Sequence, residues 1–187
     1  MENNKTELRL TFQNVLSITF SILLLVGIIV CAICDAAISG AFTWSLYPIS
    51  SILFVWFVFM PLIKYGIKGT LGSLTAFSIL IIPFLYVLSK IIDNNLIMTI
   101  GIRMSLFSIA YLWCVYLIFR RVKERKIIAT AFSLLLAIPL HIAINVSLAE
   151  ILSLPAFEIW DIISFAIMIA SVVILFIIDY FTRRKKA

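Results

Sequence analysis

Apolar residues in this 187-residue chain form long runs, and the charged residues gather in the short segments between them. An α-helix needs about 20 predominantly apolar residues to cross the hydrocarbon core of a bilayer. Six of the runs are close to this length. They predict an all-α integral membrane fold with six transmembrane helices, over about residues 11–34, 48–63, 69–89, 99–119, 127–149 and 162–181.

The segments between these helices are short hinges, so the six helices are expected to form three hairpins. Lys and Arg gather at one end of the hairpins, at Lys5, Arg9, Lys64, Lys68, Arg120, Arg121, Lys123, Arg125, Lys126 and residues 183–186. At the other end the basic residues are Lys90 and Arg103 alone. Basic residues accumulate on the cytoplasmic side of membrane proteins. The charge pattern therefore predicts that both termini are cytoplasmic (N-in, C-in).

The composition agrees with a membrane environment. Of the residues, 64% are apolar and 13% are charged, and a soluble chain of this size has too little volume to bury that much apolar surface. The helices use nearly the whole chain, which predicts a single polytopic membrane domain over residues 1–187. The net charge of +6 does not indicate nucleic acid binding, because the basic residues lie beside helix ends, where anionic lipid attracts them. The expected partners are the lipid bilayer and other membrane proteins.

Small and polar residues form one row on the fifth predicted helix, at steps of four: Ala129, Ser133, Ala137, His141, Asn145 and Ala149. Steps of four give a ridge along one helix face, and polar groups on such a face avoid lipid. We expect the ridge to face protein or a water-filled cavity. His141, Asn145 and Ser133, with Arg103 near them, are candidates for a ligand or proton site. The alternative is that His141 and Asn145 only form hydrogen bonds between helices.

Acidic and aromatic residues gather at the non-cytoplasmic end. They are Asp35, Trp44, Asp93, Glu150, Trp160 and Asp161, with Glu158 beside them. Trp at a helix end is typical of the membrane interface. These residues form either a rim that recognises a cationic ligand or an ordinary solvated boundary. Arg103 is expected to pair with one of the carboxylates or to extend toward the water phase.

Small residues also mark the start of the third predicted helix. Gly69, Gly72, Ser73 and Ala76 form two overlapping pairs with a spacing of four residues. Pairs of this kind let the backbone of a neighbouring helix come close. We therefore expect a neighbouring helix to pack tightly at this point.

Few residues offer catalytic or metal chemistry. Cys31 and Cys34 have the C-x-x-C spacing of a redox pair, although residues three apart also share a helix face for simple packing. A single histidine and scattered cysteines provide no set of metal ligands. No zinc-protease, hydrolase or nucleotide-binding motif is present in the sequence. We therefore expect no catalytic residue, no metal and no cofactor, and a protein that is not an enzyme.

Two hinge sequences carry a resemblance to a known family. They are Gly-Ala-Phe-Thr-Trp-Ser-Leu-Tyr-Pro at residues 40–48 and Phe-Glu-Ile-Trp-Asp at residues 157–161. Together with the layout of spans and the ending at Asp179 and Tyr180, they resemble a family of small six-span membrane proteins of Gram-positive bacteria, which is catalogued as a domain of unknown function. The resemblance covers nearly the whole chain and implies a bacterial plasma-membrane location. It implies no activity.

Two main hypotheses on function follow. In the first, the protein is a non-catalytic accessory or interaction protein of the cell envelope. In the second, it is the substrate-capture subunit of a transporter, since its size and short hinges are similar to those of the vitamin-binding subunits of energy-coupling-factor transporters. Those subunits carry an A-x-x-x-A pattern on the first helix, where this chain has Ser17/Ser21 and Gly27/Cys31 at that spacing. A membrane dithiol oxidoreductase that uses Cys31 and Cys34 is a third alternative.

Overall fold

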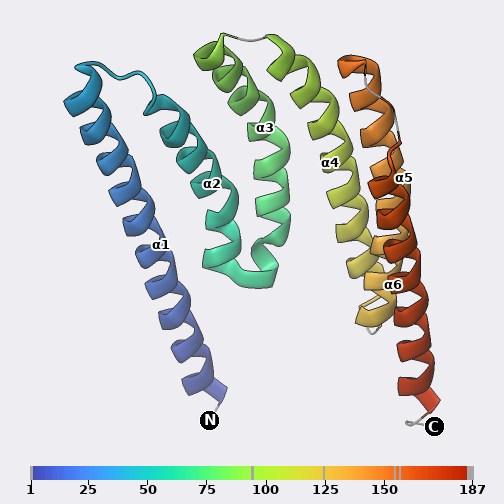
Figure 1. Ribbon diagram of the computed structural model, residues 1–187. Helices are drawn as coiled ribbons and strands as arrows, with labels where there is room; N and C mark the ends of the chain where they lie inside the picture. Colours follow the sequence, from blue (N-terminus) through green and yellow to red (C-terminus); the bar gives the residue numbers. More distant parts are fainter. Residues whose placement is uncertain (1, 94, 124, 154, 156, 185–187) are drawn as a thin grey trace. The chain divides into compact units, whose positions relative to one another are not determined.

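The computed structural model describes residues 2–93, 95–123, 125–153, 155 and 157–184. Within these residues the regular structure is entirely helical and contains no strand. The helices are α1 (Glu2–Ser39), α2 (Leu46–Tyr65), the short 3₁₀ helix η1 (Gly66–Gly69), α3 (Thr70–Ile92), α4 (Asn95–Arg121), α5 (Lys126–Leu152) and α6 (Ile159–Arg184) (Figure 1). The predicted spans fall on these helices, which confirms the all-α prediction.

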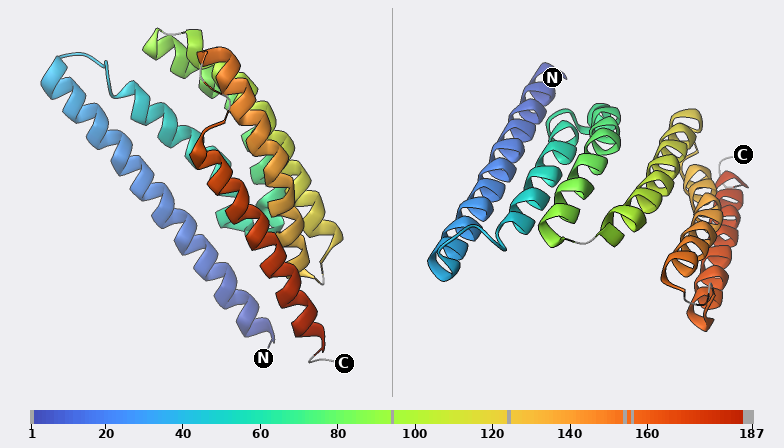
Figure 2. Two further views of the ribbon diagram at one scale, coloured as in Figure 1. Left: turned by 45° about the vertical axis from the view of Figure 1, so that its right-hand side comes forward. Right: turned by 90° about the horizontal axis from the view of Figure 1, so that it is seen from above.

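The helices group into two units by their contacts, Met1–Gly101 and Ile102–Ala187. In the N-terminal unit, α1 packs against α2, and α2 packs against α3 (Figures 1 and 2). In the C-terminal unit, α5 packs against α6. The prediction that the whole chain forms a single membrane domain stays a prediction.

Five helical stretches of the described chain are long and apolar enough to cross a membrane: Phe12–Ser39, Leu46–Ile92, Leu96–Arg121, Lys126–Leu152 and Ile159–Thr182. The second of them is 47 residues long and contains both α2 and α3, which η1 separates. Apolar side chains lie exposed along the helices; Leu23, for example, is 65% exposed and Ile79 is 70% exposed. Large exposed apolar surfaces mark contact with lipid or with other proteins. The helices therefore suggest a membrane protein.

Residues with a left-handed backbone follow three of the helices. Gly40 (φ 68°) follows α1, Asp93 (φ 53°) follows α3 and Ser153 (φ 55°) follows α5. This conformation turns the chain out of the helix and lets its N–H groups bond back to carbonyls of the last turn. The prediction that the first helix ends at residue 34 is wrong, because α1 continues through Asp35 to Ser39. The hinge, and not the end of the apolar run, sets the length of this helix.

The turn between α2 and α3 is very closely packed. A Cβ atom on Gly69 would lie 1.9 Å from the carbonyl oxygen of Pro61, and one on Gly72 would lie 3.2 Å from the Pro61 Cβ. The hydroxyl of Ser73 donates a hydrogen bond to the carbonyl of Val58. These contacts confirm the predicted close approach of a neighbouring helix.

Candidate functional site

The predicted ridge on α5 faces protein. Ala129 is fully buried, Ser133 is nearly so, and Ala137, His141, Asn145 and Ala149 are half-buried. Some residues between them are more exposed, such as Leu135 and Val146 at 47% each, whereas Ala131 is fully buried and others are half-buried. Because α6 packs against α5, the small and polar face of α5 is turned toward protein while the larger apolar side chains point outward. The burial of Ala129 and Ser133 agrees with the expectation for the ridge, which stays a prediction for its outer half.

Two residues of the ridge meet the first turn of α6. The side-chain amide of Asn145 donates a hydrogen bond of 2.7 Å to Oδ1 of Asp161. The ring nitrogen Nε2 of His141 lies 3.2 Å from the same oxygen and 3.3 Å from the amide nitrogen of Asn145. We call these three residues the polar clasp. Their contacts join α5 to α6 close to the loop that connects the two helices.

Proton positions in the polar clasp follow from what each group can donate. A carboxylate only accepts hydrogen bonds, so a bond between His141 and Asp161 requires a proton on Nε2 of the imidazole. That nitrogen then has no lone pair for the amide of Asn145, and the 3.3 Å separation is a contact without a shared proton. With the proton on Nε2, the clasp has two donors, His141 and Asn145, on a single carboxylate oxygen; with the proton on Nδ1, Nε2 instead accepts from the Asn145 amide.

The second oxygen of Asp161 serves α6 itself. Oδ2 accepts a hydrogen bond of 2.8 Å from the backbone N–H of Glu158. A side chain in the first turn that reaches back to the N–H before the helix is half of a capping box. Asp161 thus holds the start of α6 and ties it to α5. Both of these are structural roles.

Aromatic rings cover the polar clasp. The ring of His141 stands edge-on to Phe165, with 4.9 Å between centroids, and Phe157 contacts Phe165 at 6.3 Å. The side chains of His141 and Asp161 keep 29% and 22% of their surface exposed. Partial shielding strengthens the hydrogen bonds to the carboxylate, because fewer water molecules compete for it.

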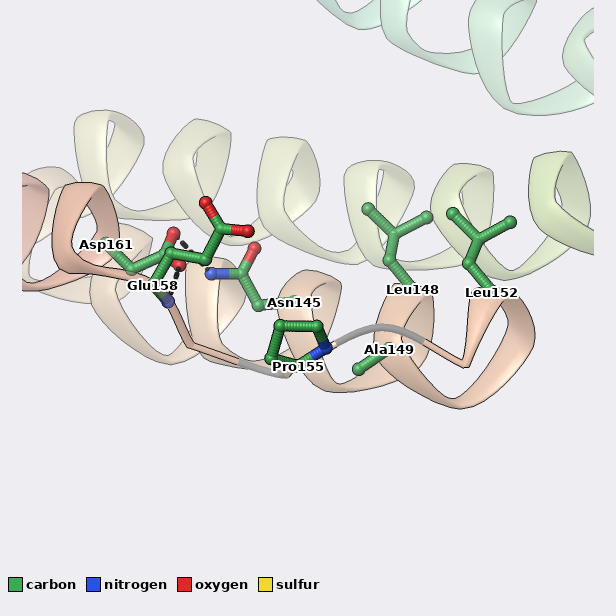
Figure 3. A pocket seen from close by; sticks show the side chains of 7 residues that line it. All are labelled: Asn145, Leu148, Ala149, Leu152, Pro155, Glu158 and Asp161. Carbon is green, nitrogen blue, oxygen red and sulfur yellow. Dashed lines mark hydrogen bonds between the residues drawn. The ribbon is translucent and has the colours of Figure 1, made fainter.

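A small pocket lies beside the polar clasp. It has a volume of about 180 Å³ and is lined by Asn145, Leu148, Ala149, Leu152, Pro155, Glu158 and Asp161. Asn145, Glu158 and Asp161 stand together at one end of it, and Leu148 and Leu152 stand at the other (Figure 3). Two carboxylates favour a cation over an anion. Pockets for drug-sized ligands usually measure roughly 300–1,000 Å³, so only a small molecule fits here.

Arg103 and Ser133 lie apart from the polar clasp. Nη1 of Arg103 forms an ion pair of 2.7 Å with Oε2 of Glu150, and the two side chains are 43% and 69% exposed. Arg103 therefore pairs with an outer carboxylate, one of the two outcomes expected for it. The hydroxyl of Ser133 donates to the carbonyl of Ala129 at 2.8 Å, and the Ser133 carbonyl accepts from the hydroxyl of Tyr111 at 3.3 Å. The four residues predicted to share one site, His141, Asn145, Ser133 and Arg103, therefore take part in three separate sets of contacts.

The sequence predicted that Asp35 belongs to an exposed outer rim, but the structure places this side chain inside the hinge. It is fully buried, and its carboxylate accepts hydrogen bonds from the backbone N–H of Thr43 at 2.6 Å, from the Thr43 hydroxyl at 2.9 Å and from the backbone N–H of Ser45 at 2.9 Å. The hinge between α1 and α2 folds back over α1 and binds this side chain. The rim interpretation of Asp35 is therefore wrong, because the loop that covers it supplies its partners.

Of the other predicted rim residues, Asp161 is half-buried in the polar clasp, whereas the rest lie at the surface. Asp93 is exposed at the end of α3, Trp44 is 40% exposed and Trp160 is 75% exposed. The thiols of Cys31 and Cys34 are free, the first half-buried and the second exposed. Among the described residues, no three His, Cys, Asp or Glu side chains are placed to hold a metal ion.

Thr43, Ser45 and Phe165 are contact residues that the sequence had not indicated. Their partners lie eight or more positions away, beyond the reach of helical spacing. The contact of Asn145 with Asp161 likewise joins two helices across the connection at residues 153–158.

Comparison of the chain with known proteins gives no match, since no family model, no characterised sequence and no solved structure is significantly similar to it. The resemblance to six-span proteins of Gram-positive bacteria therefore stays a prediction, and function is argued from the geometry alone.

Proposed function

We propose that the chain is a multi-pass protein of the bacterial plasma membrane that works as a non-catalytic accessory protein of the cell envelope. Its partners in this role are the lipid bilayer and other membrane proteins. The observation that carries the proposal is the exposure of apolar side chains along the helices, of which Leu23 and Ile79 are examples. Such surface needs lipid or a protein partner to cover it. The buried carboxylate of Asp35 and the carboxylate of Asp161, by contrast, are bonded within the chain.

The proposed topology has six spans in three hairpins, with both termini cytoplasmic. α2 and α3 have 20 and 23 residues, and each is close to the length of one bilayer crossing. A single span of 47 residues would be about 70 Å long at 1.5 Å per residue, more than twice the hydrocarbon thickness. The turn that divides them carries Lys64 and Lys68, which supports a cytoplasmic position for it.

The arrangement of the polar clasp favours an accessory role over turnover. Both oxygens of Asp161 already accept hydrogen bonds, from Asn145 and from Glu158. These bonds give Asp161 a positioning role between the two helices, and the carboxylate can still accept a further hydrogen bond. The neighbouring pocket of about 180 Å³ is also smaller than the usual site for a vitamin-sized ligand.

A second candidate function is the capture of a small organic cation. The observation in its favour is the pocket in which Asn145, Glu158 and Asp161 stand together (Figure 3). A primary ammonium group could donate to the two carboxylates while a short alkyl chain lies against Leu148 and Leu152. The pocket lies beside Asn145, where the sequence predicted a capture site. Arg103, which belonged to that prediction, does not line it.

One experiment separates the two candidates. A photo-crosslinking amino acid is placed at lipid-facing positions such as Leu23 and Ile79 in living cells, and the purified protein is heated with methylammonium, butylammonium and choline. The accessory role predicts a crosslink to a defined membrane protein from one helix face and an unchanged melting temperature with all three cations. Capture predicts a melting shift with at least one cation that Asp161→Asn abolishes; because a capture subunit also has a transporter partner, the melting shift and not the crosslink separates the two candidates. Such a shift would overturn the accessory role.

A further inference from the structure

Two hollows of opposite character lie along the C-terminal part of α4 and the first half of α5. One has a volume of about 360 Å³ and is lined by Leu117, Arg120, Arg121 and Lys123. The other has a volume of about 370 Å³ and is lined entirely by apolar residues, which are Ile118, Phe132, Leu135, Leu136 and Pro139. The consecutive residues Leu117 and Ile118 belong to one hollow each, so that the two hollows border neighbouring residues of α4.

The basic hollow is equipped for phosphate. Arg120, Arg121 and Lys123 are all exposed, and no hydrogen bond or ion pair joins their side chains to another residue of the described chain. Arginine presents its N–H groups in a fork that matches the oxygens of a phosphate. With respect to the described residues, the three cations are therefore available to an anion at the end of α4.

The apolar hollow lies at the depth of lipid chains. Phe132 and Pro139 are six and thirteen residues from the start of α5 at Lys126, which corresponds to depths of about 9 and 20 Å at 1.5 Å per residue. One leaflet contributes about 15 Å of hydrocarbon. Phe132 and Leu135 are 44% and 47% exposed, so a chain lying in the hollow would meet open apolar side chains.

We propose that these two hollows form one binding site for an anionic phospholipid. The phosphate-bearing headgroup contacts Arg120, Arg121 and Lys123, and an acyl chain lies along Phe132, Leu135 and Pro139. A phospholipid carries a charged phosphate next to an apolar chain, so it can occupy the basic hollow and the apolar hollow at the same time. A soluble anion would leave the apolar hollow unfilled, and a partner helix would leave the three cations without counter-charge. The inference needs a membrane protein but neither the six-span topology nor the accessory role.

Juxtamembrane basic residues strengthen binding to anionic lipid by roughly fivefold each. Three of them in one hollow predict that the full-length protein prefers phosphatidylglycerol to phosphatidylcholine by at least about tenfold. Native mass spectrometry of the protein in detergent, with the two lipids at equal concentration, measures this preference directly. Inorganic phosphate in millimolar excess should not displace the lipid, because it cannot fill the apolar hollow.

Two pairs of variants test the two halves of the site. The triple variant Arg120→Gln, Arg121→Gln and Lys123→Gln should lose the preference at least about tenfold, whereas the control Lys64→Gln with Lys68→Gln on the α2–α3 turn should keep it. Leu135→Trp fills the apolar hollow and should weaken lipid retention, whereas Ile142→Trp, on the same helix outside the hollow, should not. The single variant Arg121→Gln, with about a fivefold loss, replaces the triple one if the latter does not fold.

Three outcomes would overturn the proposal. An equal loss in the two charge variants would show a general effect of surface charge and no site. Displacement of the lipid by inorganic phosphate would show a headgroup site without an acyl chain. Unchanged lipid retention in Leu135→Trp would show that the apolar hollow is not occupied.

Discussion

The amide of Asn145 on α5 donates a hydrogen bond of 2.7 Å to the carboxylate of Asp161 at the start of α6. Residues 16 positions apart in sequence are thereby joined across a helical hairpin. Asp161 also holds its own helix through the N–H of Glu158. One carboxylate therefore stabilises both the start of α6 and its packing on α5.

Removal of the amide should loosen this hairpin. In Asn145→Ala, Asp161 loses its shortest hydrogen bond, and the free energy of unfolding should fall by about 0.6–2 kcal/mol, the range for side-chain hydrogen bonds in membrane proteins and to charged groups. Thermal unfolding of the purified protein in one detergent measures the loss. Ser147→Ala, two residues along the same helix, is the matched control and should change stability little. Equal melting temperatures for Asn145→Ala and the wild type would show that the bond contributes nothing.

Asp35 should matter more than any exposed acid. Its buried carboxylate accepts three hydrogen bonds from the hinge, and Asp35→Ala would leave these donors without their acceptor, at a cost of about 1–3 kcal/mol for each donor that stays buried. We expect faster hydrogen exchange at the amides of Thr43 and Ser45 and earlier proteolysis of the hinge. Glu150→Ala serves as the control, because its exposed ion pair with Arg103 should contribute no more than about 1 kcal/mol. Unaltered exchange at Thr43 in Asp35→Ala would contradict the role assigned to the carboxylate.

Gly69 should tolerate no side chain. A Cβ atom there would lie 1.9 Å from a backbone oxygen of Pro61, so Gly69→Ala must displace one of the two helices. Overpacking typically costs about 1–3 kcal/mol and occasionally more, and a clash with backbone places this variant at the upper end, so it should be produced in lower yield or melt earlier. Gly27→Ala is the control, since its Cβ would make only an ordinary 3.4 Å contact with the end of the Ile52 side chain. Similar melting temperatures for the two variants would refute the close packing of α2 and α3.

The helical fold could be predicted from the sequence because a bilayer fixes the length of an apolar run. The ends of the helices could not, since the hinge chemistry decides them. α1 continues past Asp35 until Gly40 adopts a left-handed backbone. The periodicity of apolar residues does not indicate where a left-handed residue ends a helix. A glycine that follows the apolar run does indicate it.

The candidate site could be predicted only in part. The steps of four on α5 placed His141 and Asn145 on a protein-facing ridge, because helical geometry alone determines which residues share a face. The partner Asp161 depends on how α6 returns along α5, and the burial of Asp35 depends on how the hinge folds over α1. Both are tertiary contacts, and neither follows from the spacing of residues within one helix.

The central claim is a six-span membrane protein with both termini on the cytoplasmic side, and labelling of single cysteines in intact cells tests it most directly. In a background without Cys31, Cys34 and Cys114, one cysteine at a time is placed at Lys68, Asp93, Lys123, Glu158 or Arg184. A membrane-impermeant maleimide is then added before or after permeabilisation. If the chain has six spans and cytoplasmic termini, Asp93→Cys and Glu158→Cys should react in intact cells, and the other three cysteines should react only after permeabilisation. Labelling of Lys68→Cys and Lys123→Cys on opposite sides of the membrane would contradict it.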